Sequence, residues 1–325
     1  GDVVLALDAT NGEMLWRYSH DSEVATSHKF GIALHENKVL VPTSNFHMVA
    51  LDARSGEVIW DHAIEMEDYD GYQLRSAPTI AGGQVIQGMA ASFVPGGGFI
   101  VAIDLETGTE TWRFNTIPRP GEPGGNTWNN MPVEERQGGS VWNTGAYDPE
   151  LDLVYYGVSP TYNTAPLLYP LNIDGVTNEA LYTNATLAIR PATGELVWYY
   201  QHVVNDQHDL DWIFERSIVE LDVNGETRKV VVTAGKPALF DALDAETGQY
   251  LFSVDTGFQN LFAAINPETG EKIPNPNIFP DAEEIRTVCP YWQGGRNWHA
   301  SSINNETGYL FVPMFEVCMD TLLDG

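Results

Sequence analysis

The sequence predicts an all-β fold, on three observations. One short motif recurs along the 325 residues, β-branched runs bounded by Gly, Asn or Pro precede its copies, and no stretch keeps a helical period for three turns. The 43% of apolar residues suffices for a core. A formal net charge of −29 argues against nucleic acid as a partner. No apolar run reaches the roughly 18 residues of a membrane-spanning helix.

The recurring motif joins Ala-x-Asp, a Gly and a large aromatic residue at fixed offsets. Its glycines are 44, 52, 86 and 54 residues apart, close to the ~40–50 residues of one four-stranded propeller blade, and the 86-residue step carries a long insertion. A similar stretch at 264–274 follows its predecessor too closely for another blade and is interpreted as a turn inside an insertion. The five copies are residues 6–16, 50–60 and 102–112, then 188–198 with Arg190 for Asp and 242–252 with Phe252 for Trp.

Each copy of the motif has a mechanical interpretation. The Asp carboxylate ends an apolar strand and accepts amide hydrogens of the turn, and the Gly supplies the positive φ of a hairpin turn with a bulge. We expect the aromatic ring on the next strand to wedge between neighbouring blades. The inner strands are expected at residues 37–44, 83–90, 152–159 and 228–235.

The repeat, with its Gly turn and its Trp, resembles that of the pyrroloquinoline-quinone (PQQ)-dependent alcohol and methanol dehydrogenases, quinoprotein β-propellers with eight blades. The resemblance implies one propeller domain over residues 1–325, truncated at both ends, in which about five to six blades leave the ring incomplete. Two Gly/Pro-rich insertions are expected near 116–139 and 160–183. Three further segments resemble family segments in the same order: residues 138–157, 195–212 and 288–313.

Three carboxylates, Asp206, Asp209 and Asp211, lie within six residues. They repel one another, so a bound cation or a shared proton is expected, although an Asp-rich solvated loop explains the spacing equally well. Alternation along an extended segment would put Asp209 and Asp211 on the same side. The resemblance implies that Asp209 is the catalytic base and a metal ligand, and that Asp211 is the extra ligand of lanthanide-type methanol dehydrogenases. His208 stands where the family commonly has Trp.

Five further residues match positions that bind the quinone in the family. The resemblance implies that the Ser140 hydroxyl hydrogen-bonds PQQ, that Trp142 forms the floor under its planar ring, and that Lys236 polarises a quinone carbonyl. Asn297 and Trp298 resemble a further polar contact. Plainer interpretations stay open: Trp142 as another blade-docking ring, although it lies outside the repeat frame, Lys236 as a surface lysine, and Asn297 as a turn former.

Three departures from the family pattern concern its metal and its quinone. The metal-binding Glu aligns near Ser92 and Phe93, and the metal-binding Asn aligns with Pro160, with Asn163 three residues on. The vicinal cysteine pair that covers the quinone in methanol dehydrogenases is missing from residues 25–31. Calcium or a lanthanide is expected from the resemblance, while the residues themselves leave the metal and the turnover open.

The leading functional hypothesis is a periplasmic PQQ-dependent oxidoreductase. It would oxidise a small alcohol by hydride transfer to PQQ, with Asp209 as general base and a cytochrome c or another acceptor receiving the electrons. The alternative is a non-catalytic propeller scaffold of the outer-membrane assembly type. That alternative explains the lost metal ligands, but it gives no reason for the joint presence of Ser140, Trp142, Asp209, Lys236 and Asn297.

The only two cysteines are Cys289 and Cys318. Their settings resemble a disulfide-bearing pair of the family, whereas two buried reduced thiols are the plainer interpretation. A disulfide would close a loop of ~30 residues and would indicate an oxidising compartment, in agreement with a periplasmic location.

Overall fold

The computed structural model describes residues 2–22, 31–68, 70–278, 283–304 and 306–322. These residues form 24 strands and three short 3-10 helices. The prediction of an all-β propeller is confirmed: the structure contains four complete four-stranded antiparallel sheets with the strands of each in chain order, and shorter sheets before and after them. Among the described residues, no helix is long and apolar enough to cross a membrane.

The four complete blades each follow one meander. The first contains β3 (Ala33–His35), β4 (Lys38–Pro42), β5 (His47–Asp52) and β6 (Val58–Ala63). The second contains β7 (Thr79–Ala81), β8 (Gln84–Gly88), β9 (Phe99–Asp104) and β10 (Glu110–Asn115). The third contains β11 (Ala146–Asp148), β12 (Leu153–Gly157), β13 (Ala185–Ile189) and β14 (Leu196–Gln201). The fourth contains β15 (Ser217–Val223), β16 (Glu226–Ala234), β17 (Leu239–Asp244) and β18 (Tyr250–Asp255).

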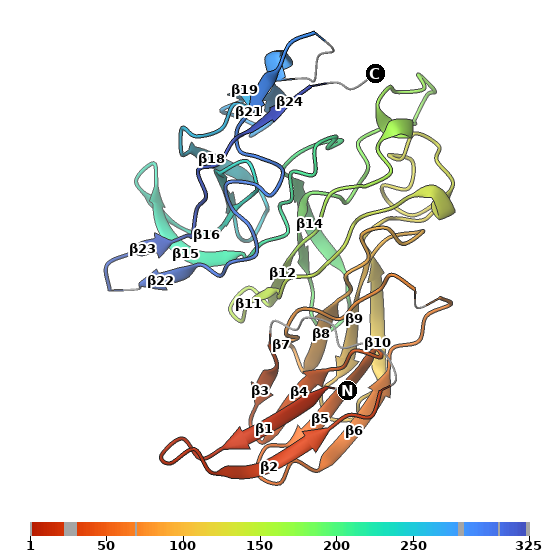
Figure 1. Ribbon diagram of the computed structural model, residues 1–325, viewed down its shortest axis with the longest axis vertical. Helices are drawn as coiled ribbons and strands as arrows, with labels where there is room; N and C mark the ends of the chain where they lie inside the picture. The colour runs from red at the N-terminus through yellow and green to blue at the C-terminus, as the bar shows by residue number, and fades with distance from the viewer. Residues whose placement is uncertain (1, 23–30, 69, 279–282, 305, 323–325) are drawn as a thin grey trace.

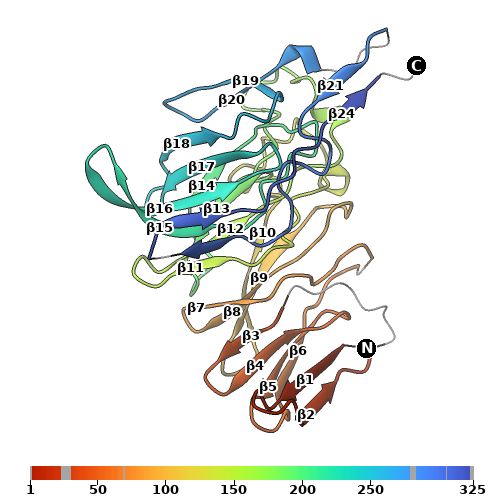
Figure 2. The ribbon, with the colours of Figure 1, turned by 60° about the vertical axis from the view of Figure 1, so that its left-hand side comes forward.

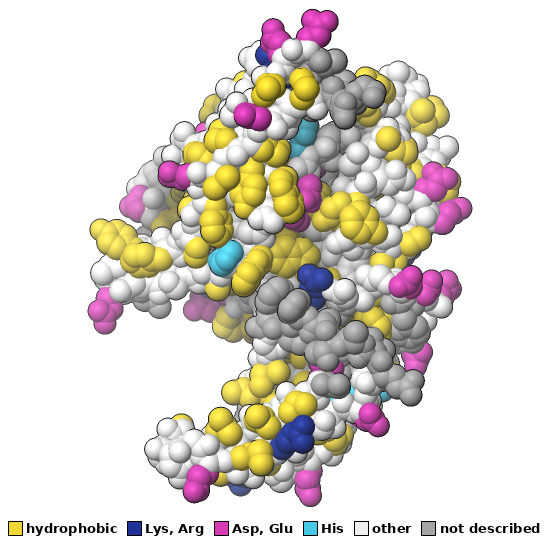
Figure 3. All heavy atoms as spheres, in the orientation of Figure 1, with side chains coloured by type: hydrophobic (Ala, Val, Ile, Leu, Met, Phe, Trp, Pro, Cys, Tyr) yellow, Lys and Arg dark blue, Asp and Glu magenta, His cyan; other side chains and the backbone are white. Residues whose placement is uncertain are grey.

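Two-stranded sheets lie at both ends of this series. In Figures 1 and 2 the first of them lies at the bottom and the C-terminal sheets lie around the fourth blade. Figure 3 shows a broad notch in the molecule between the N-terminal sheets at the bottom and the C-terminal part above. The sheets are β1 (Val3–Leu7) with β2 (Met14–Ser19), β19 (Phe262–Ile265) with β20 (Lys272–Pro274), β21 (Arg286–Val288) with β24 (Met319–Thr321), and β22 (Ser302–Asn304) with β23 (Tyr309–Phe311).

The repeat motif forms the contact between neighbouring sheets. Each of its tryptophans lies on the last strand of a sheet, with its ring against the turn glycine of the next sheet. A Cβ on Gly56 would lie 2.6 Å from the Trp16 ring, so that turn has no room for a side chain. The indole N–H also donates to a carbonyl of that turn: Trp16 to Ala53 (3.0 Å), Trp60 to Leu105 (3.1 Å), Trp112 to Pro191 (2.8 Å) and Trp198 to Ala245 (3.2 Å).

The turns of the motif are built as the sequence predicts. In the first complete blade, Asp52 Oδ1 accepts the amide hydrogens of Arg54 and Ser55, both at 2.9 Å, and Gly56 has φ of 73°. The pairing of β5 with β6 shifts register between Ala50 and Leu51, which places a bulge beside the turn. Equivalent register shifts accompany the other four copies.

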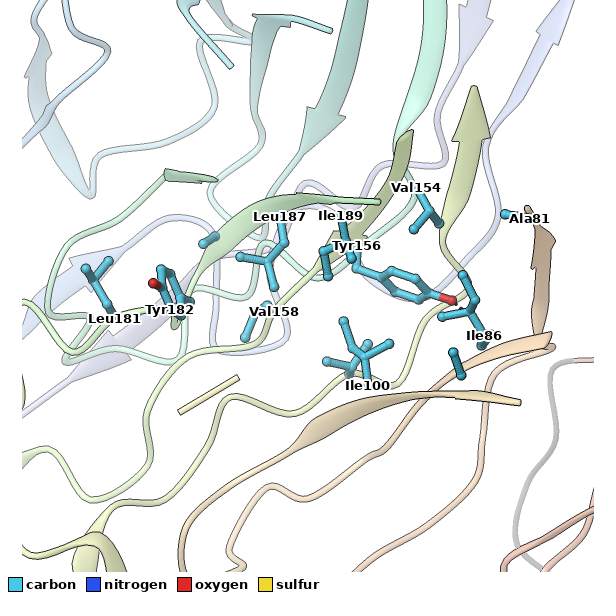
Figure 4. Packing of buried hydrophobic residues seen from close by; sticks show 13 residues of the cluster. Ala81, Ile86, Ile100, Val154, Tyr156, Val158, Leu181, Tyr182, Leu187 and Ile189 are labelled. Atoms are coloured by element: carbon cyan, nitrogen blue, oxygen red, sulfur yellow. Dashed lines mark hydrogen bonds between the residues drawn. The ribbon is translucent and has the colours of Figure 1, made fainter. Parts of the chain in front are cut away.

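The core lies between the sheets. Figure 4 shows one cluster in which Tyr156 of the third blade points toward Ile86 of the second, with Ile100 of the second blade in the same cluster. The Tyr156 hydroxyl donates to the Ile86 carbonyl at 3.0 Å, so the buried phenol is satisfied across the contact. Burial raises the pKa of Tyr156 far above its ordinary value, and the phenol stays neutral.

Two long loops, one between the second and third blades and one inside the third blade, pack on one another. The segments between β10 and β11 and between β12 and β13 contain only the 3-10 helices η1 (Val133–Glu135) and η2 (Ala165–Leu167). Buried Trp128 in the first donates its indole N–H to Leu181 O in the second at 2.6 Å. Residues 264–274 form the hairpin of β19 and β20, as the interpretation of a turn requires, and Tyr200 donates to Thr269 O in it at 3.0 Å.

Candidate active site

The site begins with an ion cluster at the end of β16. Lys236 Nζ lies 2.7 Å from Asp209 Oδ2 and 2.9 Å from Asp211 Oδ2. The Lys236 and Asp211 side chains are each 7% exposed, whereas the Asp209 side chain is 39% exposed. Lys236 is therefore not the surface lysine of the plainer interpretation, and of the two carboxylates only that of Asp209 is open to solvent.

The segment that carries the carboxylates is a turn and not the extended segment that the sequence predicts. Asp209 has φ of 59°, and the buried Asp206 carboxylate accepts the amide hydrogens of His208 (2.7 Å) and Leu210 (2.6 Å). Asp209 and Asp211 nevertheless meet at Lys236, because this turn rotates both toward it. The Lys236 amide donates to Asp211 O at 2.9 Å, which fixes the turn to the end of β16.

Burial dominates the electrostatics of the cluster. It raises the pKa of Asp211 to about 6 against the attraction of Lys236, and the neighbouring Asp209 adds to the rise. Burial works against the charge of Lys236, but the two carboxylates outweigh it and raise the pKa of the ammonium. Asp209 Oδ1 and Asp211 Oδ1 are both buried without a hydrogen-bond partner. Each carboxylate thus has one oxygen that no hydrogen bond satisfies.

Two neutral hydroxyl groups extend the cluster. The Tyr162 hydroxyl lies within hydrogen-bonding reach of the Ser92 and Asp209 side chains, and burial raises its pKa far above the ordinary value. The Phe93 ring packs against Tyr162 with 4.8 Å between centroids. Tyr162 was not predicted from the sequence. Its only signal was its place two residues after Pro160, where the family places a metal-binding Asn.

The donor set does not fit a calcium or lanthanide ion. Calcium takes six to eight oxygens, with carboxylates prominent among them, and no group of three or more His, Cys, Asp or Glu side chains within the described part of the chain is arranged to hold a metal. Asn163 donates to Glu135 O at 2.9 Å on the surface. A divalent ion about 4 Å from the Lys236 ammonium would also meet a repulsion on the order of 8 kcal/mol at an effective dielectric constant near 20.

The other predicted quinone residues fall into two groups. Trp142 lines a cavity of about 810 Å³ together with Ala91 and Ser92. Ser140 is buried beside it, and its hydroxyl accepts the Ala91 amide hydrogen at 2.8 Å. Trp142 meets the Phe214 ring edge-on at 5.6 Å. Trp142 lies outside the strands, and among the described glycines none has its ring as a near neighbour, unlike the four tryptophans of the repeat.

Asn297 and Trp298 line a second cavity, of about 360 Å³, together with Lys236. The Asn297 amide donates to Gln293 O at 2.7 Å and its Oδ1 accepts the Trp298 amide hydrogen at 2.8 Å, so Asn297 does shape a turn. The Trp298 ring stacks on His299 with 4.2 Å between centroids. The structure thus places Lys236, Asn297 and Trp298 together. Ser92 lines the larger cavity, and its contact with Tyr162 connects that cavity to Asp209.

Basic side chains in the larger cavity were also missed. The lining of this cavity includes three basic and three acidic residues: Arg75, Arg113 and Arg119, and Glu67, Asp68 and Asp70. Arg119 is held by hydrogen bonds to Gly96 O (2.7 Å) and Ile117 O (3.0 Å). Guanidinium groups bind carboxylates in fixed geometry, so these arginines can bind carboxylates of a ligand at their side of the cavity. Nothing in the local sequence around these arginines distinguishes them from surface residues.

The loop that carries Asn297 is tied down at both ends. The predicted disulfide between Cys289 and Cys318 is confirmed, with 4.4 Å between the Cα atoms. At the other end, buried Arg296 donates to Ala234 O at 2.9 Å and forms an ion pair with Glu215. Its guanidinium lies 5.0 Å from the centre of the Phe214 ring, on which Trp142 also packs. The two cavities are therefore supported by shared residues.

Comparison with known families assigns the fold. The family described as PQQ, the glucose/ethanol/alcohol dehydrogenase β-propeller domain, matches residues 1–258. The chain belongs to this PQQ family. Residues 25–30, where the family's cysteine pair would lie, are outside the described residues.

Curated relatives of this chain include quinone and quinohemoprotein alcohol dehydrogenases. The quinohemoprotein alcohol dehydrogenase ADH IIB of Pseudomonas putida is 33% identical, over 97% of this chain and 47% of its own length. The dehydrogenase subunit of the quinone alcohol dehydrogenase of Komagataeibacter europaeus is 32% identical, over 97% of this chain and 46% of its own length. The chain thus spans about half the length of these curated relatives.

Solved structures of the family have the same architecture. The quinohemoprotein alcohol dehydrogenase ADHIIG of Pseudomonas putida HK5 superimposes with a TM-score of 0.84 and 29% identity, over 96% of this chain and 48% of that one. A europium-containing methanol dehydrogenase gives a TM-score of 0.82 over 98% of this chain and 59% of that one. Its identity is 24%, and that likeness shows the fold alone.

Proposed function

We propose that this chain is the quinone-binding part of a PQQ-dependent alcohol dehydrogenase. One observation carries the proposal: Asp209 keeps an unpartnered carboxylate oxygen while its other oxygen binds the buried Lys236. This pair lies in a chain of the PQQ family. It contacts Tyr162, which connects it to the cavity lined by Trp142.

The residues present fit the quinone. The Trp142 indole offers a flat surface in a cavity of about 810 Å³, and Arg75 and Arg119 supply cations for the carboxylates of a tricyclic acid. Four further residues complete the group that would hold the quinone: Ser140, Lys236, Asn297 and Trp298. PQQ, when bound, accepts a hydride equivalent from the alcohol carbon.

The chain's own residues supply the proton chemistry. The Asp209 carboxylate takes the hydroxyl proton of the alcohol, and Lys236 keeps this carboxylate oriented through Oδ2. The Lys236 ammonium also stabilises negative charge that develops beside it. The partly buried Tyr162 phenol stays neutral beside the Asp209 carboxylate. No step depends on a metal ion, because the donor set does not fit one.

Location and electron transfer are part of the proposal. A cytochrome c or another acceptor would take the electrons, as the quinohemoprotein names of the relatives suggest. The disulfide supports an oxidising compartment, and we propose the periplasm. The non-catalytic scaffold remains the alternative, favoured by the replacement of two family metal ligands by Ser92 and Pro160.

The test is alcohol-dependent reduction of a dye by the full-length protein. Samples with and without added PQQ are assayed over a series of primary and secondary alcohols. We expect reduction that requires both the quinone and an alcohol. Quinone binding without turnover on any alcohol would favour the scaffold, and absence of quinone binding would refute the proposal.

A further inference from the structure

A lysine ammonium lies between the two acidic side chains of the cluster. Lys236 Nζ binds one oxygen of Asp209 and one of Asp211, at 2.7 and 2.9 Å. The lysine is buried and its backbone is fixed by hydrogen bonds to Asp211 O and from the Gly295 amide. Its ammonium therefore belongs to the built site and offsets one of the two negative charges there.

The groups around this lysine reduce the attraction for a metal further. Ser92 and Tyr162, which contact each other beside Asp209, contribute neutral hydroxyl groups where a carboxylate would add charge. Pro160 has no side-chain donor, and its carbonyl accepts the amide hydrogen of Gly139 at 3.1 Å. Two carboxylate oxygens thus remain unpartnered in the cluster, too few to replace the hydration shell of a hard cation.

We propose that the Lys236 ammonium takes the place of a metal ion in this protein, so that the quinone binds without calcium or a lanthanide, and that Ser92 and Tyr162 determine this preference. The inference rests on the proposed function only for the identity of the ligand. The absence of a specific ion site can be measured on the quinone-free protein.

The first experiment uses the metal alone. Terbium is titrated into the quinone-free full-length protein and followed by luminescence sensitised by aromatic side chains, with Asp211→Asn as the matched variant. Surface carboxylates bind terbium equally in both proteins, so we expect the two curves to agree within twofold in apparent Kd. A saturable component present in the wild type and lost in Asp211→Asn would overturn the proposal.

A gain-of-site variant tests the role of Ser92. Ser92→Glu adds a third carboxylate beside Tyr162 and Asp209, so we expect a new terbium component at least tenfold tighter than any in the wild type. The double variant Ser92→Glu with Asp211→Asn should lose it again. If Ser92→Glu gains no component, Ser92 does not determine the preference and that assignment is wrong.

The second experiment measures quinone binding by quenching of tryptophan fluorescence, with excess chelator, with calcium or with lanthanum. We expect the Kd of PQQ to change less than threefold among the three conditions. A tenfold or greater tightening by either ion in the wild type would overturn the inference. If PQQ does not bind under any condition, the proposed function fails, and the terbium comparison still decides whether the cluster holds an ion.

Discussion

Two buried lysine–carboxylate clusters in this molecule have opposite designs. In the closed cluster, defined here as His202, Asp241 and Lys272, His202 Nδ1 lies 2.6 Å from Asp241 Oδ2, and Lys272 binds the same oxygen. Ser253 donates to Asp241 Oδ1 at 2.6 Å, so both oxygens of the Asp241 carboxylate have hydrogen-bond partners. In the open cluster of Lys236, Asp209 and Asp211, each carboxylate keeps one oxygen without a partner.

This difference distinguishes a cluster that stabilises the fold from a cluster that can bind a ligand. The closed cluster joins β17 and the residue after β14 to the β19–β20 hairpin, and its side chains are at most 1% exposed. It also supports the site from behind, since His202 stacks on Trp212 at 4.3 Å and Lys272 Nζ lies 4.9 Å from the same ring. Trp212 directly follows Asp211. A fully satisfied network rigidifies the structure around it, whereas a carboxylate oxygen without a partner can still accept a hydrogen bond.

Among variants of the two clusters, we expect the largest effect from substitution of Asp209. Asp209→Asn removes the base of the open cluster, so turnover should fall by about 10²–10⁴-fold, equivalent to roughly 3–5 kcal/mol. Because the Asp209 side chain is partly exposed, the free energy of unfolding should change by less than about 1 kcal/mol. Steady-state dye reduction and urea unfolding of the full-length protein check both. Retention of most activity would refute the assignment of the base.

The closed cluster should respond in the opposite way. Asp241→Asn leaves the buried Lys272 ammonium without its carboxylate, so the free energy of unfolding should fall by roughly 3–5 kcal/mol. The double variant Asp241→Asn with Lys272→Met removes the orphaned charge and should recover part of that loss. Urea unfolding measures the free energy of unfolding of the single and of the double variant. A loss below about 1 kcal/mol for Asp241→Asn would mean that the closed cluster is not structural.

We expect the disulfide to contribute slightly less to the free energy of unfolding than the closed cluster does. It closes a loop over a sequence separation of 29 residues, which stabilises the fold by about 3–4 kcal/mol in the chain-entropy model. Cys289→Ser with Cys318→Ser should lose about that much and should also loosen the loop that lines the Lys236 cavity. Urea unfolding of the double variant, compared with the reduced wild type, measures it. Unchanged unfolding midpoints would contradict the estimate.

The closed cluster also predicts a pH dependence. Burial lowers the pKa of His202 to about 4, although Asp241 opposes the shift. Between pH 6.5 and pH 4 the unfolded chain gains a proton that folded His202 does not, so acidification destabilises the wild type. From pH 7 to pH 4 the wild type should lose about 3 kcal/mol more than His202→Gln does. The surface variant His35→Gln serves as control, and equal losses in all three would contradict the prediction.

The sequence predicted what depends on local pattern. Trp60 and Gly108 belong to the same repeat frame, so their spacing alone indicates a turn and a docking ring. His202 and Asp241 are 39 residues apart and carry no such frame, and the closed cluster went unpredicted for that reason. The contact of Lys236 with Asp209, 27 residues apart, was approached only through the family resemblance.

The remaining parts of the site depend on how loops fold. Asp209 and Asp211 meet because Asp206 closes a turn, a conformation that an alternating pattern does not reveal. Tyr162 reaches Asp209 from an inserted loop, and Arg75 enters the Trp142 cavity from the segment before β7. Such contacts are set by tertiary packing, which outweighs local propensity.

The central claim is that the open cluster binds the quinone and the closed cluster only supports it. The most direct test is the Kd of PQQ for full-length Lys236→Gln and Lys272→Gln, measured by tryptophan fluorescence at a temperature where both variants are folded. We predict that Lys236→Gln weakens binding at least tenfold and that Lys272→Gln changes it less than threefold. Weaker binding in Lys272→Gln with unchanged binding in Lys236→Gln would contradict the account.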